Sequence, residues 1–141
     1  MDKFNFDQVI KKLEQAKSSL PKVLANDTKK FFLASWQKQG WDNGGVKVWS
    51  PRKYNKNKRS AGRAILVKSG ALRRAVNASL KSATFDSIKF SVDLPYAAIH
   101  NEGLKMKNGK NMPKRQYMGD SESLRKIQKE KIQKSIDKIF K

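Results

Sequence analysis

Between Asp7 and about Gln37, apolar residues recur at steps of three and four positions, which is the period of one helical face. Asp7 is a residue type that caps the start of a helix, and Gly40 ends the series. Pro21 cannot donate a backbone hydrogen bond, so it either kinks one helix or separates two helices. The pattern therefore predicts N-terminal helical structure with a kink or a break at Pro21.

The middle of the chain contains two stretches in which apolar and polar residues alternate, as in a half-buried strand. Polar residues at 82–86 supply a turn, so residues 72–94 are predicted to form a long antiparallel hairpin. One face of this hairpin, including Phe90, is expected to pack against the helices. The alternating positions are Leu72, Val76, Ala78 and Leu80 in the first stretch, and Ile88, Phe90, Val92 and Leu94 in the second.

Two further segments are predicted to be helical. Residues 95–103 look like one or two helical turns ended by Gly103, and Asp120 or Ser121 is expected to cap a last helix. Helices at both ends and an antiparallel sheet of about 3–5 strands make an α+β fold, here a single domain over residues 1–141. The apolar stripe of the last helix consists of Leu124, Ile127, Ile132, Ile136, Ile139 and Phe140.

Two segments have the composition of basic loops. Residues 40–63 are rich in Gly, Asn, Ser and Pro, and we expect the basic loop at 42–63 to be mobile in the isolated subunit. A second loop, 105–115, likewise carries cations and no acid. The cations of both loops are the candidate contacts with a partner or with DNA: Lys47, Arg52, Lys53, Lys56, Lys58, Arg59, Arg63, Lys105, Lys107, Lys110, Lys114 and Arg115.

The charge of the chain strengthens this interpretation. Lys and Arg number 32 against 12 Asp and Glu, which gives a formal net charge of +20. Such a charge favours a polyanionic partner, either a nucleic acid, an acidic protein surface or an anionic membrane. The alternative is a lysine-rich surface that only keeps the chain in solution. No apolar run is long enough for a transmembrane span or a signal peptide, so no membrane role is predicted.

Catalytic chemistry finds little support in the sequence. The absence of Cys excludes disulfides and thiolate sites, and a single His cannot build a His-rich metal site. The Gly44-Gly45 pair lacks the spacing of a phosphate-binding loop. We predict no catalytic residue, no metal and no cofactor, and we interpret His100 as a structural hydrogen-bonding residue in a helical turn.

Aromatic residues in the first loop allow two interpretations. Trp49 and Tyr54 lie among cations, a combination that stacks bases and contacts phosphates in proteins that bind single strands. Alternatively, Trp41 and Trp49 bury their rings and fix the loop to the domain. The sequence leaves both open.

Several segments, read in order, resemble one family. After Trp36 come WSP at 49–51, ILVKSGALR at 65–73, YAAIHNEG at 96–103 and MPKRQYMG at 112–119. This order resembles the phage virion morphogenesis family, the tail-completion proteins of Mu-like tailed phages, over about residues 30–125. Lys114 stands where the family usually has a small residue, and Gln116-Tyr117 where it usually has Pro-Phe. The family-motif positions with a structural role are Trp49, Gly70, Leu72, Tyr96, His100, Gly103, Pro113, Arg115 and Gly119.

The resemblance implies a non-enzymatic structural or assembly protein of the virion. It would act at the head–tail junction (the neck) or at the tail end, as a homo-oligomeric ring of, for example, about six copies. It would be made in the host cytoplasm and would contact connector and tail proteins, with weak, salt-sensitive contact to DNA in the lumen. The alternative is a stand-alone nucleic-acid-binding protein whose loops 46–63 and 105–115 grip phosphates.

Overall fold

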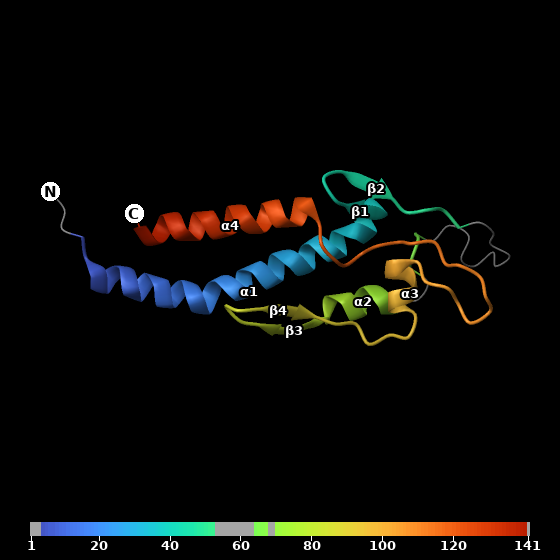
Figure 1. Cartoon of the computed structure of the whole chain (residues 1–141), viewed down its shortest axis with the longest axis horizontal. Coiled ribbons are helices and arrows are strands. Elements are labelled where there is room, and N and C mark those ends of the chain that lie inside the picture. The colour runs from blue at the N-terminus through green and yellow to red at the C-terminus, as the bar shows by residue number, and fades with distance from the viewer. Residues whose placement is uncertain (1–3, 53–63, 68–69, 141) are drawn as a thin grey trace.

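The computed structural model describes residues 4–52, 64–67 and 70–140, in which two long helices run side by side along the long axis (Figure 1). Both chain ends lie at one end of this pair, and the first hairpin and the shortest helix lie toward the other. The elements in order are α1 (Phe6–Lys38), β1 (Gly40–Asp42), β2 (Val46–Val48), α2 (Ala71–Asn77), β3 (Leu80–Ala83), β4 (Ile88–Phe90), α3 (Ala97–Glu102) and α4 (Glu122–Phe140).

Helix α1 is continuous, so Pro21 does not separate two helices. The axis of α1 changes direction along its length (Figure 1), as expected of a helix with an internal proline. The helix is capped by Asn5, whose side chain accepts a hydrogen bond from the Gln8 amide at 3.2 Å. The predicted cap, Asp7, instead lies in the first turn, where its negative charge interacts favourably with the positive end of the helix dipole and stabilises the helix.

The predicted loop at 40–63 begins as a hairpin rather than as a loop. Strands β1 and β2 pair antiparallel, with Trp41 opposite Lys47. Gly40 permits the close approach of the strands, because a Cβ there would lie 2.5 Å from the Lys47 carbonyl oxygen. The turn uses Gly44 at φ +73° and Gly45 at φ +150°, conformations that favour glycine. The remainder of the basic loop, residues 53–63, lies outside the described residues.

The prediction of one long hairpin over 72–94 is wrong. Residues Ala71–Asn77 form helix α2, and only β3 and β4 pair, so the described residues contain two two-stranded sheets rather than one sheet of 3–5 strands. Leu72 and Val76 are four positions apart, a spacing that fits one face of a helix as well as one face of a strand. The residues between them, Arg73, Arg74 and Ala75, are good helix formers, which favours the helix.

The two remaining helices begin and end as the sequence indicates. Helix α3 ends at Gly103, which adopts φ +71° and donates its amide to the Ile99 carbonyl at 3.0 Å. Ser121 caps α4, since its hydroxyl accepts a hydrogen bond from the Leu124 amide at 3.2 Å. Asp120 supports this cap by accepting a hydrogen bond from the Ser121 amide at 2.9 Å.

Helices together with two antiparallel sheets confirm the predicted α+β class, although each sheet has only two strands.

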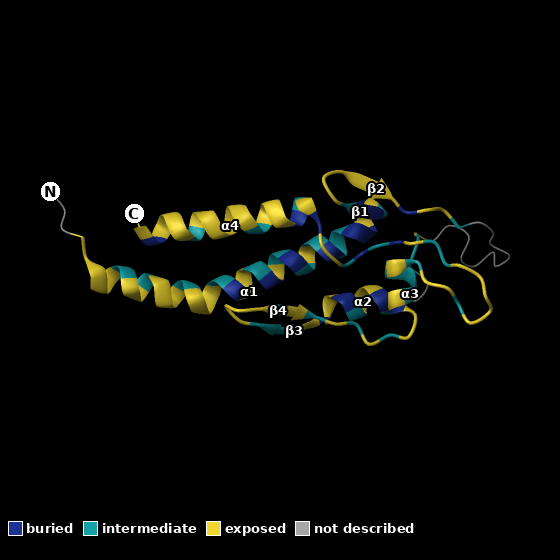
Figure 2. Ribbon diagram, in the orientation of Figure 1, coloured by how far each residue is buried: buried dark blue, intermediate teal, exposed yellow. Residues whose placement is uncertain are grey.

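The hydrophobic core lies where the second half of α1 meets the hairpins, α2 and the start of α4 (Figure 2). Phe90 is half-buried and packs edge-on against Phe32, with ring centroids 5.3 Å apart. The stripe predicted for α4 is buried only at Leu124 and Ile139. Its other members remain exposed because α4 contacts a single helix along most of its length. No helix of the described part is both long and apolar enough to cross a bilayer.

Candidate partner-binding site

Tyr117 connects two of the family-like segments, 96–103 and 112–119, through hydrogen bonds. Its side chain is 2 % exposed, and its hydroxyl donates to the Ala97 carbonyl at the start of α3 at 2.7 Å. The Asn101 side-chain oxygen accepts from the backbone amides of Tyr117 and Met118 at 2.9 and 3.1 Å. Burial, with smaller contributions from Glu102 and Tyr96, raises the pKa of Tyr117 to about 12. The phenol is therefore neutral and fixed at physiological pH.

Trp49 and Arg115 tie the first basic loop to the same place. The Trp49 ring is buried against Trp36, and its Nε1 donates to the Gln116 carbonyl at 2.8 Å. Arg115 is also buried and donates from Nε to the Ser50 carbonyl at 2.9 Å and from Nη2 to the Pro51 carbonyl at 3.3 Å. Trp41 is buried as well. Both tryptophans therefore anchor the chain, as the second interpretation expects, while Tyr54 of the first interpretation lies outside the described residues.

The described residues 64–67 and 70–72 join this cluster, the first of these stretches through contacts with α1. The Trp36 indole donates to the Leu66 carbonyl at 3.3 Å, and the Gln39 side chain accepts from the Ile65 amide at 2.6 Å. Gly70 precedes α2 in the left-handed region at φ +76°, and Leu72 is buried directly after it. The four family-like segments therefore meet around one set of aromatic rings.

A cavity of about 390 Å³ opens where three of these segments meet. Its lining combines cationic or imidazole side chains with an apolar wall, and no acid is among the described lining residues. Burial, followed by the charge of Arg115, lowers the pKa of His100, whose ring is half-buried. The Nδ1 atom of this ring is buried and has no hydrogen-bond partner among the described residues. The lining residues are Arg52, Leu66, Val67, Gly70, Ala71, Leu72, Tyr96, His100 and Arg115.

The electrostatics of this cavity are those of two neighbouring guanidinium groups. Arg52 is half-buried and donates to the Ala64 carbonyl at 2.8 Å. Burial, and secondarily the charge of Arg52, lower the pKa of Arg115. The charge of Arg115 is thus held in a partly enclosed space against the Ser50 and Pro51 carbonyls, which carry only partial negative charge.

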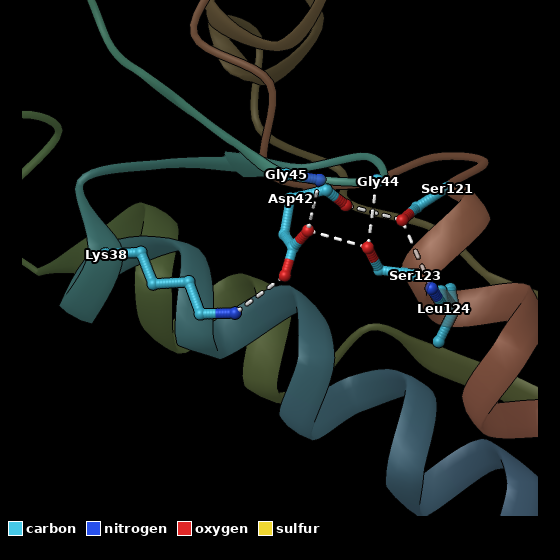
Figure 3. Close-up of polar contacts among 7 residues, drawn as sticks. All are labelled: Lys38, Asp42, Gly44, Gly45, Ser121, Ser123 and Leu124. Atoms are coloured by element: carbon cyan, nitrogen blue, oxygen red, sulfur yellow. Dashed lines mark hydrogen bonds and ion pairs between the residues drawn. The ribbon is translucent and has the colours of Figure 1, made fainter.

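A second polar network joins the β1–β2 turn to the start of α4 (Figure 3). The Asp42 carboxylate accepts from the Ser123 hydroxyl at 2.6 Å, the Gly45 amide at 3.2 Å and the Lys38 ammonium at 3.1 Å. Hydrogen bonds from Ser123 and Lys38 lower the pKa of Asp42. Ser121 donates to the Asp42 carbonyl, so one short strand fixes the N-terminus of the last helix.

The predicted partner-contacting cations are distributed unevenly. Lys47 is exposed on β2, and Lys105, Lys107, Lys110 and Lys114 are exposed on the loop after α3 and the segment that follows it. Arg52 and Arg115 instead line the cavity. The others, Lys53, Lys56, Lys58, Arg59 and Arg63, lie outside the described residues, as does Tyr54.

The remaining family-motif positions shape the backbone. At Gly103 a Cβ would lie 2.9 Å from the backbone nitrogen of Lys114, so only glycine fits between α3 and the returning chain. Gly119 adopts φ +139° just before α4, and Pro113 is half-buried. Tyr96 packs edge-on against His100, with ring centroids 6.0 Å apart.

Three positions that connect distant parts of the fold are not indicated by the sequence. Asn101 bonds two consecutive amides, while Asp42 and Ser123 connect elements about 80 positions apart in the chain. Their residue types mark turns and helix caps in general, but no local pattern reveals a partner so distant in the sequence.

Comparison with known families accounts for this arrangement. The sequence model of the phage virion morphogenesis family matches residues 6–140, nearly the whole chain. The chain belongs to this family. The match extends the resemblance beyond residues 30–125 to include both long helices. No curated protein and no solved structure gives a significant match. Family membership gives the protein a structural or assembly role in the phage virion.

Proposed function

We propose that the protein acts at the head–tail junction or the tail end of a tailed phage, as a ring of identical subunits. The observation that carries this proposal, beside family membership, is an apolar surface on the helical arm, which we define as residues 4–20 with residues 127–140. Large contiguous apolar patches on soluble proteins mark interaction sites.

The exposed apolar residues of the helical arm fall on ordered helical faces. Phe6, Ile10 and Leu13 follow four- and three-residue steps, and Ile132, Ile136 and Phe140 follow four-residue steps. Their relative exposure ranges from 37 % at Ile132 to 70 % at Phe6. A single subunit leaves these side chains in water, so contact with another subunit would bury them and stabilise an oligomer.

The net positive charge of the subunit affects both the assembly of the ring and the choice of its binding partners. Identical subunits of formal charge +20 repel one another, and the repulsion weakens as salt screens it. Acidic connector or tail proteins, or weakly held DNA in the lumen, would offset the same charge in the virion. The exposed lysines of the second basic loop fit such contacts.

Size-exclusion chromatography with light scattering tests the ring. We expect the wild-type protein to form a discrete oligomer at about 500 mM salt, where repulsion is screened. The double variant Phe6→Ser/Ile10→Ser should be monomeric with unchanged helicity, since both side chains are exposed in the subunit. The matched control Val46→Ser/Val48→Ser changes apolar residues of similar exposure on β2 and should still assemble. A wild-type monomer at every salt concentration argues against the ring.

The alternative, a stand-alone nucleic-acid-binding protein, makes a different prediction. Lys105, Lys107 and Lys110 are exposed on one loop, where they can contact phosphates. Micromolar affinity of a monomer for duplex DNA at about 150 mM salt, lost steeply with salt and in the variant with all three lysines changed to Gln, supports this alternative. Assembly without such affinity supports the virion role.

A further inference from the structure

The cavity at the meeting point of the family-like segments has the composition of an anion site. Arg52, Arg115 and His100 contribute to its lining, and none of the described lining residues is acidic. Arg115 is 7 % exposed, so its charge is nearly removed from bulk water. A buried charge is costly unless an opposite charge or hydrogen bonds compensate it. The site therefore favours a ligand that brings negative charge.

We propose that this cavity binds a carboxylate of a partner protein, carried either by an Asp or Glu side chain or by a chain terminus next to an apolar residue. This proposal rests on the proposed function only in that the partner is a neighbouring virion protein. Leu66, Val67 and Leu72 provide the apolar wall against which the neighbouring residue packs.

The donors are already oriented. The bonds from Arg115 to the Ser50 and Pro51 carbonyls fix the plane of the guanidinium, and a guanidinium has more N–H donors than these two bonds use. A planar, fixed guanidinium is suited to paired hydrogen bonds with a carboxylate. His100 also lines the cavity, but its Nδ1 atom is itself buried, so Arg115 rather than this atom supplies the hydrogen bonds to a carboxylate.

The shape of the cavity favours a protein carboxylate over the phosphates of duplex DNA. A volume of about 390 Å³ is enough for one or two side chains, and part of the lining is apolar. Duplex phosphates lie along a wide, rigid backbone and are contacted from exposed basic surfaces. Exposed lysines such as Lys105 and Lys107 provide such a surface, whereas Arg115 does not.

Nuclear magnetic resonance titration of the full chain tests the proposal. The probe is 4-methylpentanoate, a carboxylate with a branched apolar tail, added at constant ionic strength, and its neutral control is 4-methylpentanamide. We expect saturable shifts of the Arg115 Nε–H and His100 ring signals, and binding of the amide at least tenfold weaker. Arg52→Gln should weaken carboxylate binding about tenfold, while Lys47→Gln, a cation outside the cavity, should leave it unchanged.

Several outcomes would overturn the proposal. Equal binding of acid and amide would make the cavity merely apolar. Shifts spread over the exposed lysines would indicate unspecific ion association, and stronger competition by inorganic phosphate or a DNA duplex would assign the site to phosphate. The comparison of acid with amide needs no variant, so it decides the matter even if Arg52→Gln does not fold. Loss of carboxylate binding with ring formation intact refutes this proposal alone, whereas carboxylate binding by a protein that never assembles refutes the ring alone.

Discussion

The two ends of the molecule are built on the same pair of helices but differ in how they are stabilised (Figure 2). Every buried residue of α1 lies at or after Pro21, and the hydrophobic core gathers the tryptophans, Tyr117 and Leu124 at that end. In the helical arm, most apolar side chains of α1 and α4 remain exposed. At the core end, most apolar side chains are buried within one subunit, whereas in the arm many apolar side chains remain exposed to water.

The polar contacts follow the same division. At the core end, side chains bond to backbone groups far away in the sequence, such as Trp49 to Gln116 and Arg115 to Ser50. In the arm, several side-chain bonds span only three or four positions, as between Gln133 and Asp137. The long-range contacts of α4 in this range, from Gln128 to Thr28 at 3.0 Å and from Lys131 to Asp27 at 3.4 Å, reach the part of α1 after Pro21. Long-range bonds define a tertiary structure, whereas local bonds only support a helix. We infer that the core end is folded in the isolated subunit and that the arm is completed by a neighbour.

The largest expected effect compares one aromatic residue from each end. Trp49→Ala removes a buried ring and its hydrogen bond to Gln116, and should lower the free energy of unfolding by about 3–5 kcal/mol in urea titrations. Phe6→Ala, at a side chain 70 % exposed, should change it by less than about 0.5 kcal/mol in the monomer. Similar losses for both variants would mean that the two ends are equally packed.

The second prediction compares two aspartates. Asp42→Ala removes the acceptor of Ser123, Gly45 and Lys38, and should cost about 1.5–3 kcal/mol at neutral pH, as for hydrogen bonds to charged groups. Because the folded state lowers the pKa of Asp42 below 3.8, this contribution is present above that pH and is lost as the pH falls further. Asp137→Ala in the arm is the control and should cost less than about 0.5 kcal/mol. An equal loss of unfolding free energy at both positions would mean that the polar contacts of Asp42 stabilise the fold no more than the local contact of Asp137 does.

The third prediction uses alkaline pH. In the unfolded chain a tyrosine ionises near pH 10, whereas burial raises the pKa of Tyr117 to about 12, so the unfolded state loses its proton first. Stability should therefore fall by about 1.4 kcal/mol for each pH unit between 10 and 12. Tyr117→Phe should remove this part of the slope, measured by urea titration at each pH. The arm contains no tyrosine, so a slope unchanged in the variant would mean that Tyr117 is accessible to water.

Much of the core end could be predicted because its signals are local. The αL glycine after α3 and the serine before α4 have the residue types that their backbone positions require, and periodicity located both long helices. The sequence pattern wrongly predicts a strand at α2, because the spacing of Leu72 and Val76 fits both the helical period and the strand period. A segment of 7 residues contains too few helical turns for its apolar pattern to distinguish a helix from a strand.

The candidate site depended on information that periodicity does not carry. Charge places Arg115 in a basic loop, and the family resemblance gives it a structural role. It is buried because the Ser50 and Pro51 carbonyls provide acceptors that only the tertiary fold brings near. The resemblance grouped the right segments but did not indicate that they enclose a cavity. Distant backbone partners are a property of the fold, so neither charge nor the resemblance indicates which groups Arg115 contacts.

The smallest expected effect concerns His100. Its titration should make the stability of the protein depend on pH through a group that lies only in the core end. The chain has one histidine, and it lies in the core end, so few other groups change charge between pH 5 and 7. Burial and the nearby Arg115 lower the pKa of His100 below 6.5, so below this pH the unfolded state binds a proton that the folded state resists. The free energy of unfolding should therefore decrease as the pH falls from about 6.5 toward 5, and the decrease should be absent in His100→Gln. The arm variant Phe6→Ser should keep the wild-type slope, because it changes no titratable group and lies in the other region. If His100→Gln keeps the slope as well, the proton is taken up elsewhere and the imidazole is accessible to water.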